Sequence, residues 1–307
     1  MSSDARCHPE HPDPEPSTMP SPSLPWRIEP APDPVDPALE HLLSETWADA
    51  WATRGDTARA VQAASPRLRG RLLERLAASH AAEAAMVTTR LRRTPLVALS
   101  AGVHARTLYQ SPDGRPLRPG EPLRARWVEL APGSHWLAAD LQGHSEWLVL
   151  AGEVSLAGET LGVRDYHVMP AGAPPASVVA SPQGGRLFVR ESAPLPGPAE
   201  SPVTVRDAEA GWPDFAPGIR RRVLWQRDGQ AALLYLAQAG AVVPHHTHGH
   251  DEECLMVQGE LFLDDVLLQA GDYQLAPAGT GHRITETDTG VVIYAHGDLD
   301  LRFVPDR

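Results

Sequence analysis

The sequence repeats itself, and this internal repeat constrains the fold more than any other feature. Two pairs of segments correspond: EWLVLAGEV (146–154) with ECLMVQGEL (253–261), and DYHVMPAG (165–172) with DYQLAPAG (272–279). Both copies consist of short β-rich runs separated by Gly and Pro turns, which is typical of an all-β barrel or sandwich. We therefore expect two similar β domains in tandem, at residues 98–193 and 203–307.

The second copy also carries residue types that bind metal ions. His246 and His248 are separated by one residue, so their side chains lie on the same side of a β-strand. Glu252 follows after a short bend, and His282 arrives from a later segment. Three imidazoles and one carboxylate suit a first-row transition metal. We expect these four residues to bind one divalent ion, with Zn, Fe, Mn and Ni all compatible.

The first copy lacks these ligands. The residues at its corresponding positions, none of which binds transition metals, are Ala139, Leu141, Ser145 and Pro175. Its histidines, His135, His144 and His167, fall off the ligand positions, as do His245 and His250 in the second copy. We therefore expect the first copy to be structural and the second to carry the metal site.

The two halves of the metal motif match the signature of the cupin family. They read G-x5-H-x-H-x3-E-x6-G from Gly240 and G-x5-P-x-G-x2-H from Gly271. Glu253 directly follows Glu252, and with these motifs the chain resembles ChrR-like cupins over residues 98–303. The resemblance implies a mainly β fold of two tandem cupin barrels (double-stranded β-helices, or jelly rolls), which is a bicupin. Some members of the family are anti-sigma factors.

The residues before the repeat differ in character. Residues 1–37 are rich in Pro, Ser, Asp and His and cannot bury a core, so we expect a disordered tail. Residues 38–95 carry apolar side chains at helical spacing, and Asp36-Pro37 is a helix start signal. We expect a small helical segment ahead of the first barrel.

The resemblance also implies a partner for this helical segment. In the anti-sigma factors of the family, a small N-terminal helical domain holds the sigma factor and carries zinc on H-x3-C-x2-C. Here His41 is followed by Glu45 and Ala48 at those positions, so no thiolate is available. We therefore expect residues 38–95 to lack zinc, and a sigma-factor partner would have to bind without that metal.

Composition narrows the function classes further. The formal net charge is −12, which disfavours electrostatic binding to nucleic acid or to an anionic membrane surface. Cys7 and Cys254 are the only cysteines, so we expect no disulfide framework and a reducing, cytoplasmic location. The N-terminus lacks the apolar stretch of a signal peptide, and we expect a soluble protein.

Two functions of different class are compatible with the metal motif, and we expect the regulatory one, with the enzyme as the alternative. An octahedral ion would leave positions for substrate or O2, as in a metal-dependent dioxygenase acting on a small organic or carbonyl compound. A four-coordinate zinc ion would be closed and would suit a regulatory, stress-sensing protein of the anti-sigma type. No acid–base pair stands out, so no catalytic residue is assigned.

The surroundings of the ligands follow from strand parity. Counting from Glu252 places Cys254 and Met256 on the ligand side of the strand. Further residues expected to line the pocket are Tyr235, Tyr273, Tyr294, Trp225 and Arg283. The expected partners are a small molecule at the metal and a second copy of the chain in a homodimer.

Overall fold

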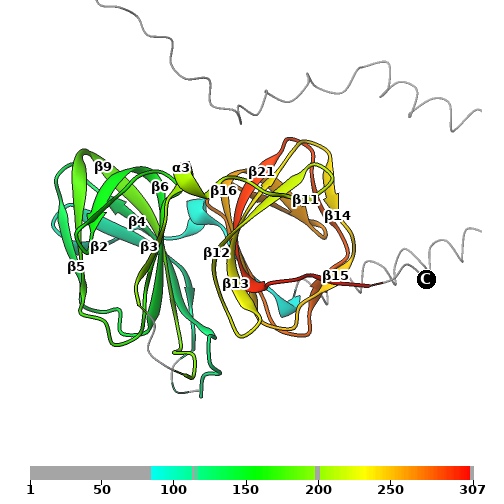
Figure 1. Cartoon of the computed structure of the whole chain (residues 1–307), viewed down its shortest axis with the longest axis horizontal. Coiled ribbons are helices and arrows are strands. Elements are labelled where there is room, and N and C mark those ends of the chain that lie inside the picture. The colour runs from blue at the N-terminus through cyan, green and yellow to red at the C-terminus, as the bar shows by residue number, and fades with distance from the viewer. Residues whose placement is uncertain (1–83, 113, 115, 198–200, 305–307) are drawn as a thin grey trace, which may run out of the picture.

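The computed structural model describes residues 84–112, 114, 116–197 and 201–304, and it is mainly β, with two β units side by side (Figure 1). We call the strands of residues 97–192 the N-terminal unit and those of residues 214–303 the C-terminal unit. The expected tail and nearly all of the expected helical segment lie outside the described residues. In the described part, no helix is long and apolar enough to cross a membrane.

The N-terminal unit is built on one nine-stranded sheet. Its own strands are β2 (Val97–Ser100), β3 (Val103–Gln110), β4 (Pro122–Leu130), β5 (His135–Ala138), β6 (His144–Leu156), β7 (Glu159–Leu161), β8 (Tyr166–Met169) and β9 (Ala176–Ser192). The order is β10-β8-β6-β9-β4-β3-β2, where β10 (Val203–Val205) comes from beyond the linker. The long strand β9 pairs with β4, β5 and β6, so it connects most of the unit.

The C-terminal unit repeats this plan with a ten-stranded and a three-stranded sheet. Its strands are β11 (Asp214–Ala216), β12 (Ile219–Arg227), β13 (Gln230–Ala237), β14 (Ala241–Val243), β15 (His246–Thr247), β16 (Glu252–Leu263), β17 (Val266–Gln269), β18 (Tyr273–Ala276), β19 (Gly281–His282), β20 (Thr285–Thr287), β21 (Val291–Asp298) and β22 (Arg302–Phe303). The large sheet runs β1-β18-β16-β21-β13-β12-β11, with β1 (Val87–Thr89) contributed from before the N-terminal unit. The small sheet runs β19-β15-β22.

A glycine at the same place in both copies allows two strands to cross closely. Gly152 in β6 has a φ of 70°, and Gly259 in β16 has a φ of 77°. A Cβ at either position would collide with a backbone carbonyl oxygen, that of Gly184 or of Gly290. The glycine of the sequence motif is therefore required by backbone geometry, and it is kept in the copy that lacks the metal residues.

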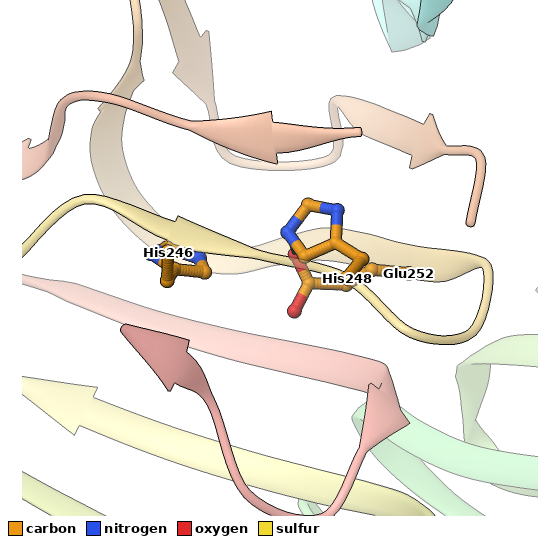
Figure 2. A group of neighbouring side chains, drawn as sticks. All are labelled: His246, His248 and Glu252. Carbon is orange, nitrogen blue, oxygen red and sulfur yellow. Dashed lines mark ion pairs between the residues drawn. The ribbon is translucent and has the colours of Figure 1, made fainter. Parts of the chain in front are cut away.

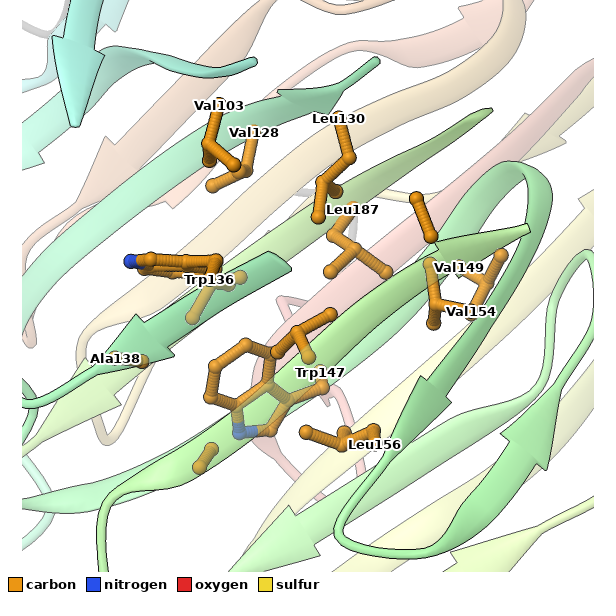
Figure 3. Packing of buried hydrophobic residues seen from close by; sticks show 14 of the residues in the cluster. Val103, Val128, Leu130, Trp136, Ala138, Trp147, Val149, Val154, Leu156 and Leu187 are labelled. Atoms are coloured by element: carbon orange, nitrogen blue, oxygen red, sulfur yellow. The ribbon is translucent and has the colours of Figure 1, made fainter. Parts of the chain in front are cut away.

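The buried apolar side chains form three clusters, one inside each unit and one between them. Inside the N-terminal unit, the rings of Trp136 and Trp147 are 5.6 Å apart between centroids (Figure 3). The cluster inside the C-terminal unit includes the fully buried Met256. The third cluster draws on both units, and the rings of Phe188 and Tyr294 meet there with centroids 5.0 Å apart. The two units therefore share an apolar interface.

Each unit receives a strand from the segment that precedes the other unit. Strand β1 pairs with β18 of the C-terminal unit, and β10 pairs with β8 of the N-terminal unit. An equivalent arginine–aspartate contact lies beside each of these two strands. Arg90 Nη1 donates to Asp272 Oδ2 at 2.8 Å, and Arg206 Nη1 donates to Asp165 Oδ2 at 3.2 Å. The exchange of β1 and β10 therefore links the N-terminal unit to the C-terminal unit through backbone pairing.

This exchange differs from the boundaries drawn on the sequence. Residues 87–89 fall within the expected helical segment, but they form a strand, because Val87, Thr88 and Thr89 are β-branched and find an open sheet edge at β18. Residues 203–205 fall within the range expected for the second barrel, but they complete the sheet of the first. The short helix η1 (Leu91–Arg93) follows β1, and the short helix α3 (Asp207–Ala210) follows β10.

Candidate metal centre

The four residues of the metal motif come together inside the C-terminal unit. His246 in β15 and His282 in β19 are directly paired across these two antiparallel strands. Glu252 is the first residue of β16. His248 lies in the bend between β15 and β16, where its backbone N–H donates to the carbonyl of Thr280 at 2.9 Å. Backbone pairing therefore joins the H-x-H segment to the segment that carries the last histidine.

The side chains converge closely. Ligand atoms of His246, His248 and Glu252 all lie within 4.8 Å of one another (Figure 2). The Nε2 atoms of His248 and His282 lie 3.0 and 3.7 Å from the same carboxylate oxygen, Glu252 Oε2. The ring of His282 is 5.0 Å from that of His248 and 5.7 Å from that of His246, between centroids. All three imidazoles are buried.

The outer nitrogen of each imidazole faces an oxygen of the protein. The three Nδ1 contacts are His246 with Pro244 O (3.0 Å), His248 with Thr280 Oγ1 (3.4 Å) and His282 with Asp264 Oδ2 (3.4 Å). In contrast, the Nε2 atoms of His248 and His282 are buried and face the Glu252 carboxylate, and neither makes a contact of good hydrogen-bond geometry among the described residues. Buried polar atoms are normally satisfied, and metal-binding imidazoles typically give their other nitrogen to an oxygen. These residues therefore fit a divalent metal ion.

The charge states of the clustered residues favour binding of a cation. Burial by itself would raise the pKa of Glu252, but the imidazoles outweigh it, His248 foremost, and lower that pKa to about 2. Burial lowers the pKa of His246, which keeps its imidazole neutral near pH 7. Burial also acts against a charge on His248, but the Glu252 carboxylate raises the pKa of that ring. A proton on His248 and a metal ion therefore compete for the same carboxylate.

Asp264 orients His282, and the sequence did not single it out. It occupies the two-residue turn between β16 and β17 with a φ of 53°, a conformation that Asp tolerates better than most residues. Its Oδ1 accepts the backbone N–H of Arg283 at 2.9 Å, while Oδ2 faces the imidazole. The pair Asp264-Asp265 between two apolar runs is a turn signal. No local pattern, however, could place that turn beside His282.

Family comparison agrees with this geometry. The model of the ChrR cupin-like domain matches residues 200–300, which contain all four clustered residues. This part of the chain is therefore similar to ChrR cupin-like domains. No match was found among curated protein sequences.

The solved structures that resemble this chain align with a longer part of it than residues 200–300. A candidate dioxygenase from Nostoc punctiforme superposes with a TM-score of 0.57 at 13% identity, covering 72% of this chain and 87% of that one. Bacillus subtilis oxalate decarboxylase, studied for its Mn(II) centres, gives 0.52 at 17% identity, covering 69% and 77%. The formate complex of Lactobacillus farciminis oxalate decarboxylase gives 0.52 at 17% identity, covering 70% and 87%. At these identities the likeness shows the fold, which is mainly β and cupin-like.

A cavity lies beside the clustered residues inside the C-terminal unit. His246, Glu252 and His282 form part of its wall. Cys254 and Tyr235 also line it, which confirms that part of the pocket predicted from the sequence. Met256, which strand parity placed on the same side, is fully buried in the core of the unit and is not part of the wall.

Other residues expected to line the pocket lie elsewhere. The aromatic residues of the cluster between the units include Tyr273, Tyr294 and Trp225. The two tyrosines pair with Leu255, whose side chain points to the face of the sheet opposite to that of Cys254, and this explains the error. Arg283 is also absent from the wall; its Nε is 3.4 Å from Asp264 Oδ1.

The N-terminal unit fills the corresponding interior with side chains. Trp147 stands at the repeat position of Cys254, is fully buried and packs on Trp136 (Figure 3). Leu141, at the position of His248, packs against the same cluster. The histidines off the motif face other oxygens: His135 faces Ser177 Oγ, His144 faces Glu146 Oε1, His167 faces Thr204 Oγ1 and His250 faces Asp298 Oδ1. None of these histidines belongs to the metal cluster of the described residues.

Proposed function

We propose that the protein is a metal-binding bicupin that takes a small molecule at a divalent ion in its ChrR cupin-like domain, as a metal-dependent dioxygenase does. His246, His248, Glu252 and His282 are the proposed ligands. The single observation that carries the proposal is the cavity, because it begins at His246, Glu252 and His282. A purely structural metal site does not require a cavity beside its ligands.

Each residue of the cluster has a part in this proposal. The bound ion, whether Fe, Mn, Ni or Zn, would supply positions for an oxygen ligand and would polarise it. Glu252 supplies the anionic oxygen that balances part of the ionic charge. Asp264 and Thr280 keep the rings of His282 and His248 turned so that Nε2 faces the shared centre.

The N-terminal unit is proposed to be a second cupin barrel that has become a scaffold. The solved structures superpose on about 70% of the chain, which is more than either unit contains. The tryptophans that fill its interior, Trp136 and Trp147, support a role in folding. In this proposal, chemistry is confined to the C-terminal unit.

The proposal is tested by cobalt substitution and oxygen uptake. We expect a five- or six-coordinate cobalt absorption spectrum that changes when a small carboxylate is added, because the cavity gives access to the ion. We expect the Fe(II)-loaded protein to consume oxygen with a substrate that fits the cavity. An intense tetrahedral spectrum that no added ligand changes would contradict both expectations.

Removal of the metal should weaken the fold without abolishing it. Each unit has its own apolar core, so the metal-free protein should keep its β-sheet circular dichroism. Bound metal should add about 3–4 kcal/mol when its free concentration exceeds the dissociation constant a few hundredfold. Differential scanning calorimetry with and without chelator should therefore show a lower melting temperature. Complete unfolding on chelation would contradict this expectation.

A regulatory, stress-sensing role is the second candidate, and one observation favours it. Strand β1 joins the chain before residue 87 to β18, which pairs with the strand that begins at Glu252. A change at the metal could therefore reach the preceding segment, where residues 38–95 are the proposed contact for a sigma factor. Binding of the full chain to a purified sigma factor, measured with and without metal, tests this role. Oxygen uptake without any such binding would favour the enzyme.

A further inference from the structure

The cavity beside the metal cluster has walls of hydrocarbon. Most of the side chains that line it are aliphatic, among them Ile219, Val243, Leu261, Leu263 and Ile293. The cavity has a volume of about 60 Å³, which is room for several water molecules at ~10–15 Å³ each. An apolar space of this size favours a ligand with a hydrocarbon body.

The charges around the cavity suit a ligand with one negative charge. Among the described residues that line it there is no arginine, and the chain contains no lysine. A divalent ion bound to the Glu252 carboxylate and to neutral imidazoles leaves one net positive charge. A singly charged ligand neutralises that charge. A dianion would instead leave a buried negative charge without a cation beside it, which is strongly unfavourable.

Thr285 adds a hydroxyl group to the cavity wall. Thr285 is part of the cavity wall and is 9% exposed, and its Oγ1 has no hydrogen-bond partner among the described residues. The nearby Thr287 differs, since its hydroxyl donates to the carbonyl of Glu260 at 2.6 Å. Thr285 is paired with Val243 and Leu263, which are also part of the wall. A buried hydroxyl is costly to leave unsatisfied, and a ligand can satisfy it.

From these observations, and resting on the function proposed above, we infer the chemical class of the ligand. It is a singly charged oxygen donor, such as a carboxylate or an enolate, with an aromatic or branched aliphatic body. It also carries one hydroxyl or carbonyl group that bonds to Thr285. Small dianions such as oxalate do not fit this cavity, although oxalate decarboxylases are among the structural neighbours.

The test measures ligand binding rather than turnover. The cobalt-loaded full-length protein is titrated with acetate, benzoate, 3-hydroxybenzoate, 4-hydroxybenzoate and oxalate, and dissociation constants are taken from the cobalt absorption bands. We expect benzoate to bind at least about tenfold more tightly than acetate, because its ring is buried. Oxalate should bind most weakly. One of the two hydroxybenzoates should bind about fivefold more tightly than benzoate, through Thr285.

Three variants separate the contributions. Thr285→Val keeps the shape of the side chain and should abolish the gain from the ligand hydroxyl while leaving benzoate unchanged. Ala241→Leu adds bulk to the wall and should weaken benzoate about tenfold with little effect on acetate. The matched control is Val242→Leu at the adjacent position, which is 56% exposed and should change none of the constants. Cobalt content and circular dichroism establish that each variant is folded.

The outcomes distinguish the ligand class from the function on which it rests. The ligand class is overturned if oxalate binds as tightly as benzoate, if neither hydroxyl improves binding, or if the improvement persists in Thr285→Val. In each of these cases the cobalt bands would still support the metal site. Absence of cobalt bands in the wild-type protein would overturn the proposed function, and with it the ligand class, because the charge balance requires the ion.

Discussion

Replacement of His282 by alanine should abolish tight binding of the metal ion, and so should replacement of His246. The two imidazoles are paired across β15 and β19 and are both nearly inaccessible to solvent, so no other side chain can take their place. Loss of an outer partner of a ligand typically changes metal affinity about 10–100-fold. Loss of a direct ligand should therefore exceed about 100-fold. Metal content after purification, and competition with a chromogenic chelator, measure this effect.

The controls for this prediction come from the repeat itself. His144→Ala and His135→Ala remove histidines of the N-terminal unit, which lie outside the metal cluster of the described residues. Both variants should keep one metal ion per chain. A stoichiometry near two in the wild-type protein, persisting in His246→Ala, would show that the first unit also binds metal and would contradict the assignment.

The convergence of His246, His248, Glu252 and His282 could be predicted from the sequence, because it depends on short-range spacing and on the alignment of the two repeats. The H-x-H spacing fixes the side of the strand, and the repeat aligns the turn before His282 with the turn after Met169. The walls of the pocket were predictable only in part. Cys254, predicted by strand parity, and Tyr235, predicted by residue type, lie in the wall. Trp225, Tyr273 and Tyr294 lie between the units instead.

The exchange of β1 and β10 could not be predicted from the sequence. A three-residue strand carries too short a pattern to show which sheet edge it joins. That choice depends on contacts far along the chain, such as the bond from Arg90 to Asp272. Asp264 is similar, since its turn is visible in the sequence while its proximity to His282 depends on the packing of whole strands.

The second glutamate of the Glu252-Glu253 pair has a different role from the first, and it leads to the second large prediction. Because neighbouring strand residues face opposite sides, Glu253 points toward the other unit. There it forms an ion pair with Arg190 of β9, and Arg190 Nη1 also donates to Glu146 Oε1 at 2.7 Å. All three of these side chains are buried. One guanidinium therefore joins the matching glutamates of both copies.

Tyrosine hydroxyls complete this network. Tyr166 and Tyr294 each donate to Glu146 Oε2 at 2.6 Å, and Tyr273 donates to Glu253 Oε1 at 2.6 Å. Burial raises the pKa of all three phenols, so they remain hydrogen-bond donors at physiological pH. Every carboxylate oxygen of the pair thus has a named donor. Such a network is stable only while all of its members are present.

Arg190 also supplies the charge that keeps Glu146 ionised. Burial would raise the pKa of Glu146, but the charges of His296, of Arg190 and of His144, in that order, lower it to about 2. His296 lies 3.3 Å from this carboxylate, but burial and the nearby Arg190 lower the pKa of His296 to about 3, so it is neutral near pH 7. Near neutral pH, Arg190 therefore supplies a permanent positive charge beside Glu146.

Substitution of Arg190 by leucine should lower the free energy of unfolding by about 3–5 kcal/mol, because it leaves two buried carboxylates without their cation. Urea denaturation followed by circular dichroism measures the change. Arg190→Lys should recover only part of the loss, since an ammonium cannot reproduce the planar fork. The control is Arg220→Ala, whose exposed ion pair with Asp214 spans 3.5 Å and should contribute less than about 1 kcal/mol.

The pH dependence separates this electrostatic cause from a simple packing defect. Because the pKa of Glu146 is lowered by folding, its stabilising contribution is present above the unfolded value of about 4.3 and is lost as the pH falls toward about 2. The Arg190→Leu variant has lost the part of that contribution that comes from the guanidinium. The stability difference between wild type and variant should therefore shrink between about pH 4.5 and pH 2.5. A difference that stays constant over this range would mean that Arg190 acts through its packing and not through its charge.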